Sequence, residues 1–454
     1  MRVPDSAKRY IRWLTDAKCL ALATIILFVA HLWLVAPVLQ NGDGAVYNEQ
    51  IEQCTLSIRT PHLGYMVLGI IFNKILPFGT ERNLNLMCLV FASFGAAAII
   101  AIARKHGSTW LAALFAGLLV FGIRSYLRGA VLAEVDGVAC SLILIALASW
   151  IYGYRIATGI AYGAAMLVTP LSSLSLPVFL FTSNREKATL RNLLRHSLDL
   201  CIFGVSALAV YAPLVLYFWQ DYWHGGRGLL RAPRQPWDLH EQVMRSVRFF
   251  TSPAMPWVVL GLAGILVGTT KRKSIAFGTV VAIAGAATVG ERFLDVPVQL
   301  PQLCMLAVFA VLVIDRIPNK KILLCALAVL WATSALPSYF DERNEIRDKL
   351  GLAEVYKEMA RQTPKLMVVG LGDSWIDGLQ FERLIYHRTK LGLGLDYRQF
   401  RGSSRAISRT HRDYAIWLMS PAPTGTMNPF LKAWRKENRS IRGQAFEVWL
   451  PTES

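Results

Sequence analysis

The sequence contains few charged residues and few cysteines for its length. Only 17% of its 454 residues are charged and seven are cysteine, whereas 54% are hydrophobic. Six cysteines fall in or beside apolar segments and the region after about residue 338 has none, so we expect no structural disulfide. No glycine-rich nucleotide-binding loop is present, and no internal repeat of the kind found in transporters is visible. No cleavage site follows the first apolar segment, which indicates an uncleaved membrane anchor.

The apolar residues occur in long blocks, which predicts a multi-pass α-helical membrane protein. A spanning helix needs roughly 20 residues. Windows of this length place about eleven spans at 19–39, 84–104, 109–125, 136–153, 156–169, 171–184, 199–219, 254–269, 275–290, 302–315 and 320–337. The two segments divided by Pro170 are also compatible with one broken helix.

The net charge of +18 comes from short basic clusters between the apolar blocks. This distribution follows the positive-inside rule and does not favour nucleic acid as a partner. If the basic N-terminus is cytoplasmic, alternation places the other basic loops on the same side, provided that 63–77 does not cross the membrane. We interpret 63–77 as an interfacial helix anchored by Tyr65 and Lys74. The alternative is an ordinary span, which reverses the topology after it.

With this topology, the first outside loop, 40–83, carries several charged side chains beside a membrane segment. It reads "QNGDGAVYNEQIEQCTLSIRTPHLGYMVLG" in its charged part and includes Asp43, Arg59 and His62. An aspartate at this depth costs little free energy if it is solvated, so Asp43 alone is compatible with a simple flanking charge. It becomes a candidate site residue because the next outside loop is also charged.

The second outside loop places Arg128, Glu134 and Asp136 at the start of a predicted span. Carboxylates at this depth are costly unless they are paired or line a wet cavity, so they are candidate site residues. The alternative is an Arg128–Glu134 ion pair that only fixes helix packing.

A third outside loop contains Arg227, Arg231 and Arg234 beside tryptophans. Arginine matches phosphate oxygens in bidentate fashion, and aromatic rings suit the headgroup level of a membrane. The loop therefore predicts recognition of an anionic lipid headgroup. The alternative is a solvated surface that attracts acidic lipid in bulk.

The motifs "GDGAVYNEQI", "TPHLGYMVLGIIFNKILP", "LAEVDGVACSLILIALASW" and "YGAAMLVTPLSSLSLPVFLF" follow a first apolar anchor. This succession resembles the GT-C class of membrane glycosyltransferases, which includes protein O-mannosyltransferases and the aminoarabinose transferase of lipid A. The resemblance implies that Asp43 is the catalytic base and that Glu134, which matches the acidic residue before the fourth span, is a second catalytic residue. His62 and Tyr65 match the family's second motif, although this chain has His-Leu-Gly-Tyr where relatives have a double proline.

The resemblance also implies a polyprenyl-phosphate sugar as donor and a glycan, glycolipid or protein as acceptor, at the outer side of a bacterial inner membrane. The remaining residues named above (Arg59, Arg128, Asp136 and the three loop arginines) are then expected to bind donor or acceptor. No cofactor is expected, although Glu134 and Asp136 with Asp43 could hold a divalent metal. A transporter or flippase of a lipid-linked sugar is the alternative function, and a non-catalytic scaffold stays open.

We expect residues 1–338 to form the transmembrane domain and residues 339–454 a small extracytoplasmic α/β domain. An amphipathic helix near Leu350 is predicted first, followed by strands in "KLMVVGLGDSWIDG", "YAIWLMS" and "AFEVWLP". The segment "GLGDSWIDG" also resembles the first block of SGNH hydrolases, with Ser374 as nucleophile. The later blocks of that family are missing, so a glycine turn after a strand is the simpler interpretation.

Overall fold

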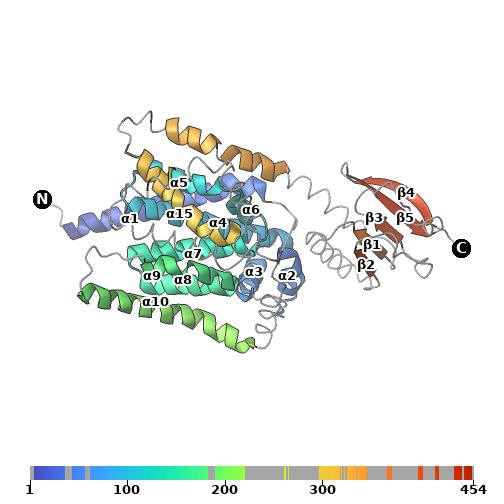
Figure 1. Ribbon diagram of the computed structural model, residues 1–454, viewed down its shortest axis with the longest axis horizontal. Helices are drawn as coiled ribbons and strands as arrows, with labels where there is room; N and C mark the ends of the chain where they lie inside the picture. Colours follow the sequence, from blue (N-terminus) through green and yellow to red (C-terminus); the bar gives the residue numbers. More distant parts are fainter. Residues whose placement is uncertain are drawn as a thin grey trace, which may run out of the picture. The chain divides into compact units, whose positions relative to one another are not determined.

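The structure, a computed structural model, describes most of the first half of the chain and selected segments of the second. It covers residues 5–35, 43–56, 62–181, 190–219, 260, 261, 264, 296–316, 319, 322, 325–333 and 335–344, and five strands between 366 and 451. The chain divides into two compact units, residues 1–35 with 50–343 and residues 36–49 with 344–454. Figure 1 shows that the first unit is helical and that the strands belong to the second.

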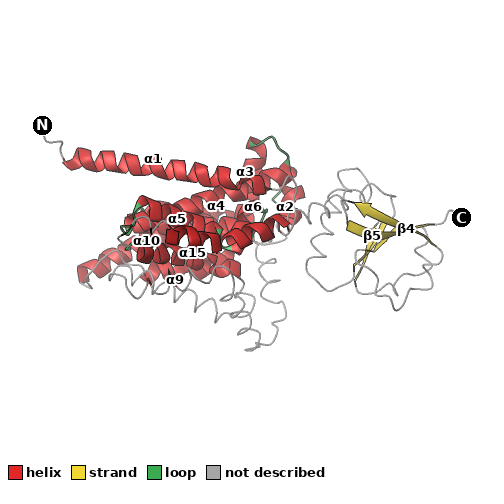
Figure 2. Cartoon of the chain, turned by 90° about the horizontal axis from the view of Figure 1, so that it is seen from above, coloured by secondary structure: helices red, strands yellow, loops and turns green. Residues whose placement is uncertain are grey.

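The first unit is a bundle of helices of very different lengths. Its labelled elements are α1 (Asp5–His31), η1 (Leu32–Leu34), α3 (Leu63–Ile75), α4 (Thr80–Lys105), α5 (Trp110–Phe121), α6 (Arg124–Val131), α7 (Val135–Tyr152), α8 (Arg155–Val168), η2 (Pro170–Ser175), α9 (Leu176–Phe181), α10 (Leu190–Tyr217) and α15 (Val296–Ile314). Figure 2 shows the same bundle from above.

Among the described residues, four helices are long and apolar enough to cross a membrane by length and composition. They are Asp16–Leu34, Thr80–Lys105, Val135–Tyr152 and Leu190–Tyr217. They fit the multi-pass helical membrane protein that the sequence predicted. The expected spans at 254–269 and 275–290 lie almost entirely outside the described residues.

The expected span 109–125 is wrong at its end. The helix α5 stops at Phe121 and α6 begins at Arg124, with a bend of 77° between them. Gly122 caps α5 in a tight position, because a Cβ there would lie 3.1 Å from the Cβ of Ala335. The helix α6 therefore occupies much of the region between the expected spans 109–125 and 136–153, where the sequence predicted the second outside loop.

The helices α4 and α7 form the centre of the bundle, and α1 and α10 lie at its edge. Most residues of α4 and α7 are buried, including Trp150. On α10, by contrast, Leu198, Val205 and Leu208 are exposed. Exposed leucine and valine on a helix of this length are typical of a surface that contacts lipid.

The helix α3 has 13 residues, a length of about 20 Å at 1.5 Å per residue. This is shorter than the hydrocarbon core of a bilayer, about 30 Å, and is compatible with the interfacial helix predicted for 63–77. The expectation that Tyr65 anchors this helix in the interface is wrong, because its side chain is fully buried in the protein and is not exposed to lipid. Lys74 is exposed, as an anchor requires.

The second unit contains a five-stranded mixed sheet with the order β2-β1-β3-β5-β4. Its strands are β1 (Leu366–Gly370), β2 (Tyr397–Arg401), β3 (Ala415–Leu418), β4 (Trp434–Ile441) and β5 (Gln444–Pro451). The strand β1 pairs in parallel with β2 and β3, whereas β5 is antiparallel to β3 and β4. Most of the predicted amphipathic helix and Ser374 lie outside the described residues.

Candidate functional site

Arg128 and Glu134 join the end of α6 to the start of α7. Arg128 lies in the last turn of α6, and Glu134 is the N-cap residue of α7. The Nε atom of Arg128 donates to Oε1 of Glu134 at 3.1 Å, and the two side chains are 30% and 25% exposed. The ion pair that the sequence left as an alternative to a binding site therefore exists, but it is open to solvent rather than sealed in the core.

The short turn between α6 and α7 depends on two facing glycines. A Cβ built on Gly137 would lie 2.1 Å from the backbone oxygen of Gly129, a distance that real side chains do not adopt. The two helices therefore approach one another with backbone against backbone. This contact holds the chain near Arg128 and Glu134 in one arrangement.

The His62 motif lies beside the end of α8. The ring of His62, which precedes α3, hydrogen-bonds through Nδ1 to the backbone oxygen of Val168 at 2.7 Å. Because a carbonyl oxygen only accepts, Nδ1 carries the proton. Gly64 rests on the backbone of Leu167, where a Cβ would come within 2.8 Å. The first turn of α3 is thus tied to the last turn of α8.

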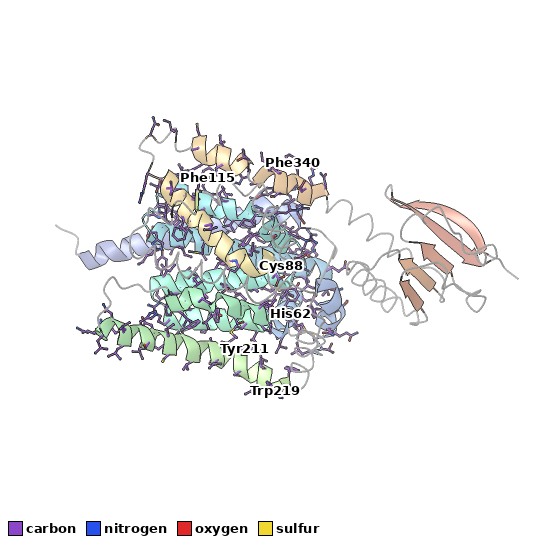
Figure 3. The ribbon with its side chains drawn as sticks, viewed as in Figure 1. His62, Cys88, Phe115, Tyr211, Trp219 and Phe340 are labelled. Carbon is purple, nitrogen blue, oxygen red and sulfur yellow. The ribbon has the colours of Figure 1, made fainter. Side chains whose placement is uncertain are left out.

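Cys88 connects this motif to the Glu134 loop. The thiol of Cys88, on α4, interacts with the side chain of Tyr65 and donates to the backbone oxygen of Glu134 at 3.8 Å. Figure 3 labels His62 and Cys88 in the bundle. The structure therefore brings together two motifs that are separated by about 70 residues in the sequence. Cys88 itself was missed, because one thiol in an apolar segment gives no signal.

A small polar cavity lies between α7, η2 and α15. Its volume is about 20 Å³, which accommodates one water molecule or one hydroxyl group, and Asp136 lines it. The other polar lining residues are Thr169, Ser172 and Ser175, and Pro301 contributes from α15. We call this cavity the Asp136 recess. The sequence pointed to Asp136 and to the break at Pro170, but it did not connect the serines and threonine after α8 with this aspartate.

Glu134 and Asp136 have different neighbours. Glu134 bonds to Arg128, whereas Asp136 lines the recess with η2. Within the described part of the chain, no group of three or more histidine, cysteine or carboxylate side chains is arranged to hold a metal ion. The hypothesis of a metal held by Glu134, Asp136 and Asp43 stays a prediction. The side chain of Asp43, the third ligand of the metal hypothesis, is outside the described residues.

Asp43 is the first residue of α2 (Asp43–Glu52). Its segment belongs to the second compact unit, whereas Arg128, Glu134, Asp136, His62 and Tyr65 belong to the first. The role of Asp43 as base therefore stays a prediction. The predicted binding residues Arg59, Arg227, Arg231 and Arg234 lie outside the described residues, and their roles also stay predictions.

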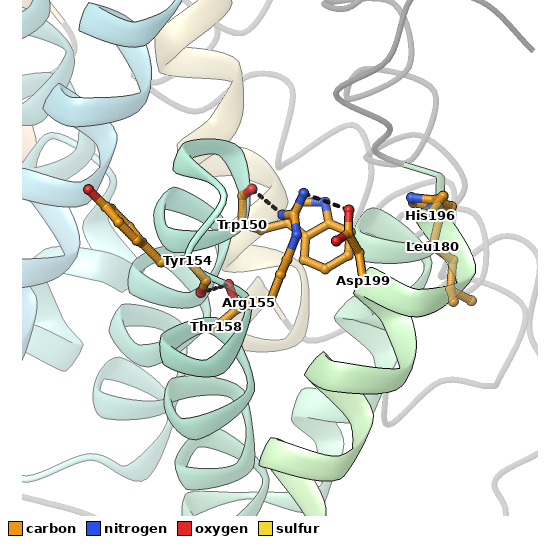
Figure 4. A network of polar contacts seen from close by, with 7 residues as sticks. All are labelled: Trp150, Tyr154, Arg155, Thr158, Leu180, His196 and Asp199. Atoms are coloured by element: carbon orange, nitrogen blue, oxygen red, sulfur yellow. Dashed lines mark hydrogen bonds and ion pairs between the residues drawn. The ribbon is translucent and has the colours of Figure 1, made fainter. Parts of the chain in front are cut away.

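A second polar cluster lies at the opposite ends of α7 and α8 and contains none of the predicted site residues. The guanidinium of Arg155 lies 4.0 Å from the centre of the Trp150 ring and bonds to Asp199 of α10 at 3.1 Å (Figure 4). Both charged side chains are largely buried, at 13% and 20% exposure. This cluster holds α10 against α7 and α8, so we assign it a structural role.

His31 is a buried polar residue within the first predicted span, and it was not among the predicted site residues. Its ring is 1% exposed and stacks on Phe121 with ring centres 3.8 Å apart. Its Nε2 atom hydrogen-bonds to the hydroxyl of Tyr339. Histidine inside a membrane segment is costly unless it is paired, and this rule was the available signal. The contact holds α1 against the end of α5.

These features define a multi-pass helical membrane protein in which Arg128, Glu134 and Asp136 lie around the start of α7. Two solved structures share this fold. ArnT from Cupriavidus metallidurans, a lipid A aminoarabinose transferase, matches in the apo state with a TM-score of 0.55 and 14% identity, over 98% of each chain. The same protein bound to undecaprenyl phosphate matches with a TM-score of 0.54 and 14% identity, over 96% of this chain and 98% of that one.

No protein-family model and no curated protein sequence matches the chain. The likeness to ArnT extends over almost the full length of both proteins. The chain therefore has the GT-C membrane fold that the succession of motifs indicated.

Proposed function

We propose that the protein is a glycosyltransferase that moves a sugar from a polyprenyl-phosphate donor to an acceptor. The observation that carries the proposal is the fold shared over 98% of the chain with ArnT, a protein that has been solved with undecaprenyl phosphate bound. The ion pair of Arg128 and Glu134 adds support, because it lies near the His62 motif, to which Cys88 connects it. The acceptor in this proposal is a glycolipid, a polysaccharide or a protein.

The reaction needs a base for the acceptor and positive charge for the leaving group. The bond between the sugar's anomeric carbon and the phosphate oxygen breaks, and the phosphate leaves with the electron pair. The acceptor oxygen forms the new bond to that carbon and gives its proton to Asp43, with inversion. Arg227, Arg231 and Arg234 stabilise the departing phosphate. No group other than donor and acceptor is consumed.

Arg128 and Glu134 hold the reacting groups in this scheme. Glu134 accepts from the Nε of Arg128 and so orients the outer end of the guanidinium, which remains partly open to solvent. An arginine held in this way is suited to a phosphate oxygen. We place the reaction on the outer side of a bacterial cytoplasmic membrane, with the N-terminus in the cytoplasm.

The test uses the purified full-length protein in nanodiscs. Binding of undecaprenyl phosphate is measured first, and release of undecaprenyl phosphate from synthetic undecaprenyl-phosphate sugars is then measured in the presence of envelope extract. We expect binding, and release with at least one sugar. Binding without release in any combination would favour a carrier or flippase, and no binding would contradict the proposal. Mass spectrometry of envelope glycans from a deletion strain then identifies the acceptor.

A further inference from the structure

The Asp136 recess is lined by the break between two apolar helical segments, α8 and η2. The helix α8 ends at Val168, Thr169 adopts an extended backbone, and Pro170 begins the 3-10 segment η2. Proline has no N–H to continue a helix, so Pro170 itself causes the break. Non-helical backbone at membrane depth is tolerated where it is buried or lines a cavity. The break therefore exposes hydroxyl side chains to a polar space that a continuous helix would not form.

The broken segment is held firmly by its neighbours. The hydroxyl of Tyr162 donates to the backbone oxygen of Ser172 at 3.2 Å, and Oγ of Ser172 donates to the backbone oxygen of Ala165 at 3.0 Å. Thr169, Ser172 and Ser175 are at most 4% exposed. A recess with such fixed walls is organised before any ligand enters, so binding there costs little conformational entropy.

The chemistry of the lining selects among ligands. Asp136 accepts hydrogen bonds, and serine and threonine hydroxyls both donate and accept. A sugar hydroxyl makes the same two kinds of bond. A phosphate group would be repelled by the carboxylate, and the other carboxylate of this loop, Glu134, is directed to Arg128. A divalent cation held by a protein takes several oxygen ligands, whereas Asp136 is the one carboxylate among the described residues of this lining.

The size and surroundings of the recess also favour a hydroxyl group as its ligand. A volume of about 20 Å³ suits a single hydroxyl group at the edge of a larger molecule. Further along α7, a second cavity of about 10 Å³ shares Ser175 and Pro301 but is lined mainly by apolar residues such as Leu147 and Phe179. The polar side chains that could select a ligand are therefore concentrated around the Asp136 recess.

We propose that the Asp136 recess binds a hydroxyl group of the sugar carried by the donor lipid, and that Asp136 thereby sets which sugars are accepted. This inference rests on the proposed function. In this arrangement the two parts of the donor bind at different places. The phosphate binds to the arginines of the third outside loop, and one edge of the sugar binds to Asp136, Thr169, Ser172 and Ser175.

The experiment compares two dissociation constants in nanodiscs. The first is the dissociation constant of undecaprenyl phosphate. The second is that of a sugar-bearing lipid, chosen as the one that binds most tightly among the glucose, mannose and arabinose esters of undecaprenyl phosphate. The ratio of the first to the second is the gain in affinity due to the sugar. In Asp136→Asn we expect this ratio to fall about tenfold, as for the loss of a hydrogen bond to a charged group, with binding of undecaprenyl phosphate unchanged. Ser172→Ala should lower the ratio less.

Two control variants match these changes. Asp341→Asn alters an exposed aspartate that lies 3.8 Å from Arg124, and Ser93→Ala alters a buried serine on α4 that bonds to Leu89. Both should leave the ratio at the wild-type value. Deoxy analogues of the preferred sugar add a second readout: wild type should lose affinity for one of them, and Asp136→Asn should not distinguish that analogue from the parent sugar.

Each other outcome overturns the inference. If Asp136→Asn weakens undecaprenyl phosphate and the sugar-bearing lipid equally, Asp136 supports the fold or the phosphate site. If it changes neither constant, or if wild type binds every sugar-bearing lipid no better than undecaprenyl phosphate, the recess does not bind sugar. Wild type that binds no polyprenyl lipid contradicts the proposed function itself, which is a distinct result.

Discussion

Arg128 and Glu134 are joined by a hydrogen-bonded ion pair of 3.1 Å across the junction of α6 and α7. A partly exposed pair of this kind adds about 1 kcal/mol or less to stability. Its contribution to folding is therefore small, whereas its contribution to orienting a guanidinium can be large. This contrast makes the pair testable by comparing activity with stability.

Glu134→Gln and Arg128→Gln should each slow sugar transfer by about 10-fold to 100-fold, equivalent to the loss of a hydrogen bond between charged groups. The thermal unfolding midpoint should move little. The double variant should be no slower than the slower single variant, because the two residues act as one unit. Transfer rates that multiply in the double variant would show that they act independently.

Asp43→Asn should reduce transfer by at least about a hundredfold, because the amide cannot accept the acceptor's proton. Binding of undecaprenyl phosphate should be retained. Glu52→Gln, an exposed position at the end of α2, is the matched control and should have a mild effect. If Asp43→Asn transfers sugar at the wild-type rate while Glu134→Gln is inactive, the base lies at the start of α7.

Neutralising Arg227, Arg231 and Arg234 should raise the apparent KM for the donor more than it lowers the folded yield. Removing each bidentate arginine–phosphate interaction is expected to cost about 1.5–3 kcal/mol of donor binding. Steady-state kinetics over a range of donor concentrations provides the measurement. Unchanged donor binding in the triple variant would show that this loop is a solvated surface and does not hold the donor phosphate.

Gly137→Ala should lower the thermal unfolding midpoint, since the added methyl group overlaps the backbone of Gly129 and such overpacking costs about 1–3 kcal/mol. Gly204→Ala on α10 is the control, because no atom lies within 4 Å of its Cβ position. That variant should be neutral or more stable by up to about 1 kcal/mol. Equal behaviour of the two variants in a thermal scan would contradict the tight junction of α6 and α7.

A topology reporter fused near residue 106 should report the cytoplasm, and one fused after residue 345 should report the periplasm. The reason is that the basic loops lie on one side only if 63–77 stays outside. The length of α3, 13 residues, agrees with this condition. The opposite pair of signals would place the Arg128 and Glu134 cluster on the cytoplasmic side and would contradict the proposed site of reaction.

The edge strands of the sheet could not be predicted from the sequence. Three strands, β1, β3 and β5, fall in segments that were predicted as strands, whereas β2 and β4 were missed. The two missed strands are the edges of the sheet, and β4 in particular is rich in charged residues, as edge strands often are. Such segments carry little hydrophobic signal, so only their pairing identifies them.

The amino-acid sequence by itself determined the membrane class, the approximate position of most helices and the succession of motifs that indicates the GT-C fold. Hydropathy and charge act locally, because each span must bury its own backbone hydrogen bonds and apolar side chains in the bilayer. These quantities can be summed over about 20 neighbouring residues without knowledge of the rest of the chain.

Only the tertiary structure decided which polar residues meet. His62 bonds to Val168, and Glu134 is directed to Arg128 while Asp136 lines a recess with Ser172. His31 reaches Tyr339 across 308 positions of the sequence. Such contacts depend on how close two helices can approach, and that distance is set by packing between distant segments, such as Gly129 against Gly137. Local composition carries no information about these distances, so the partners of each charge emerge only when the helices are assembled.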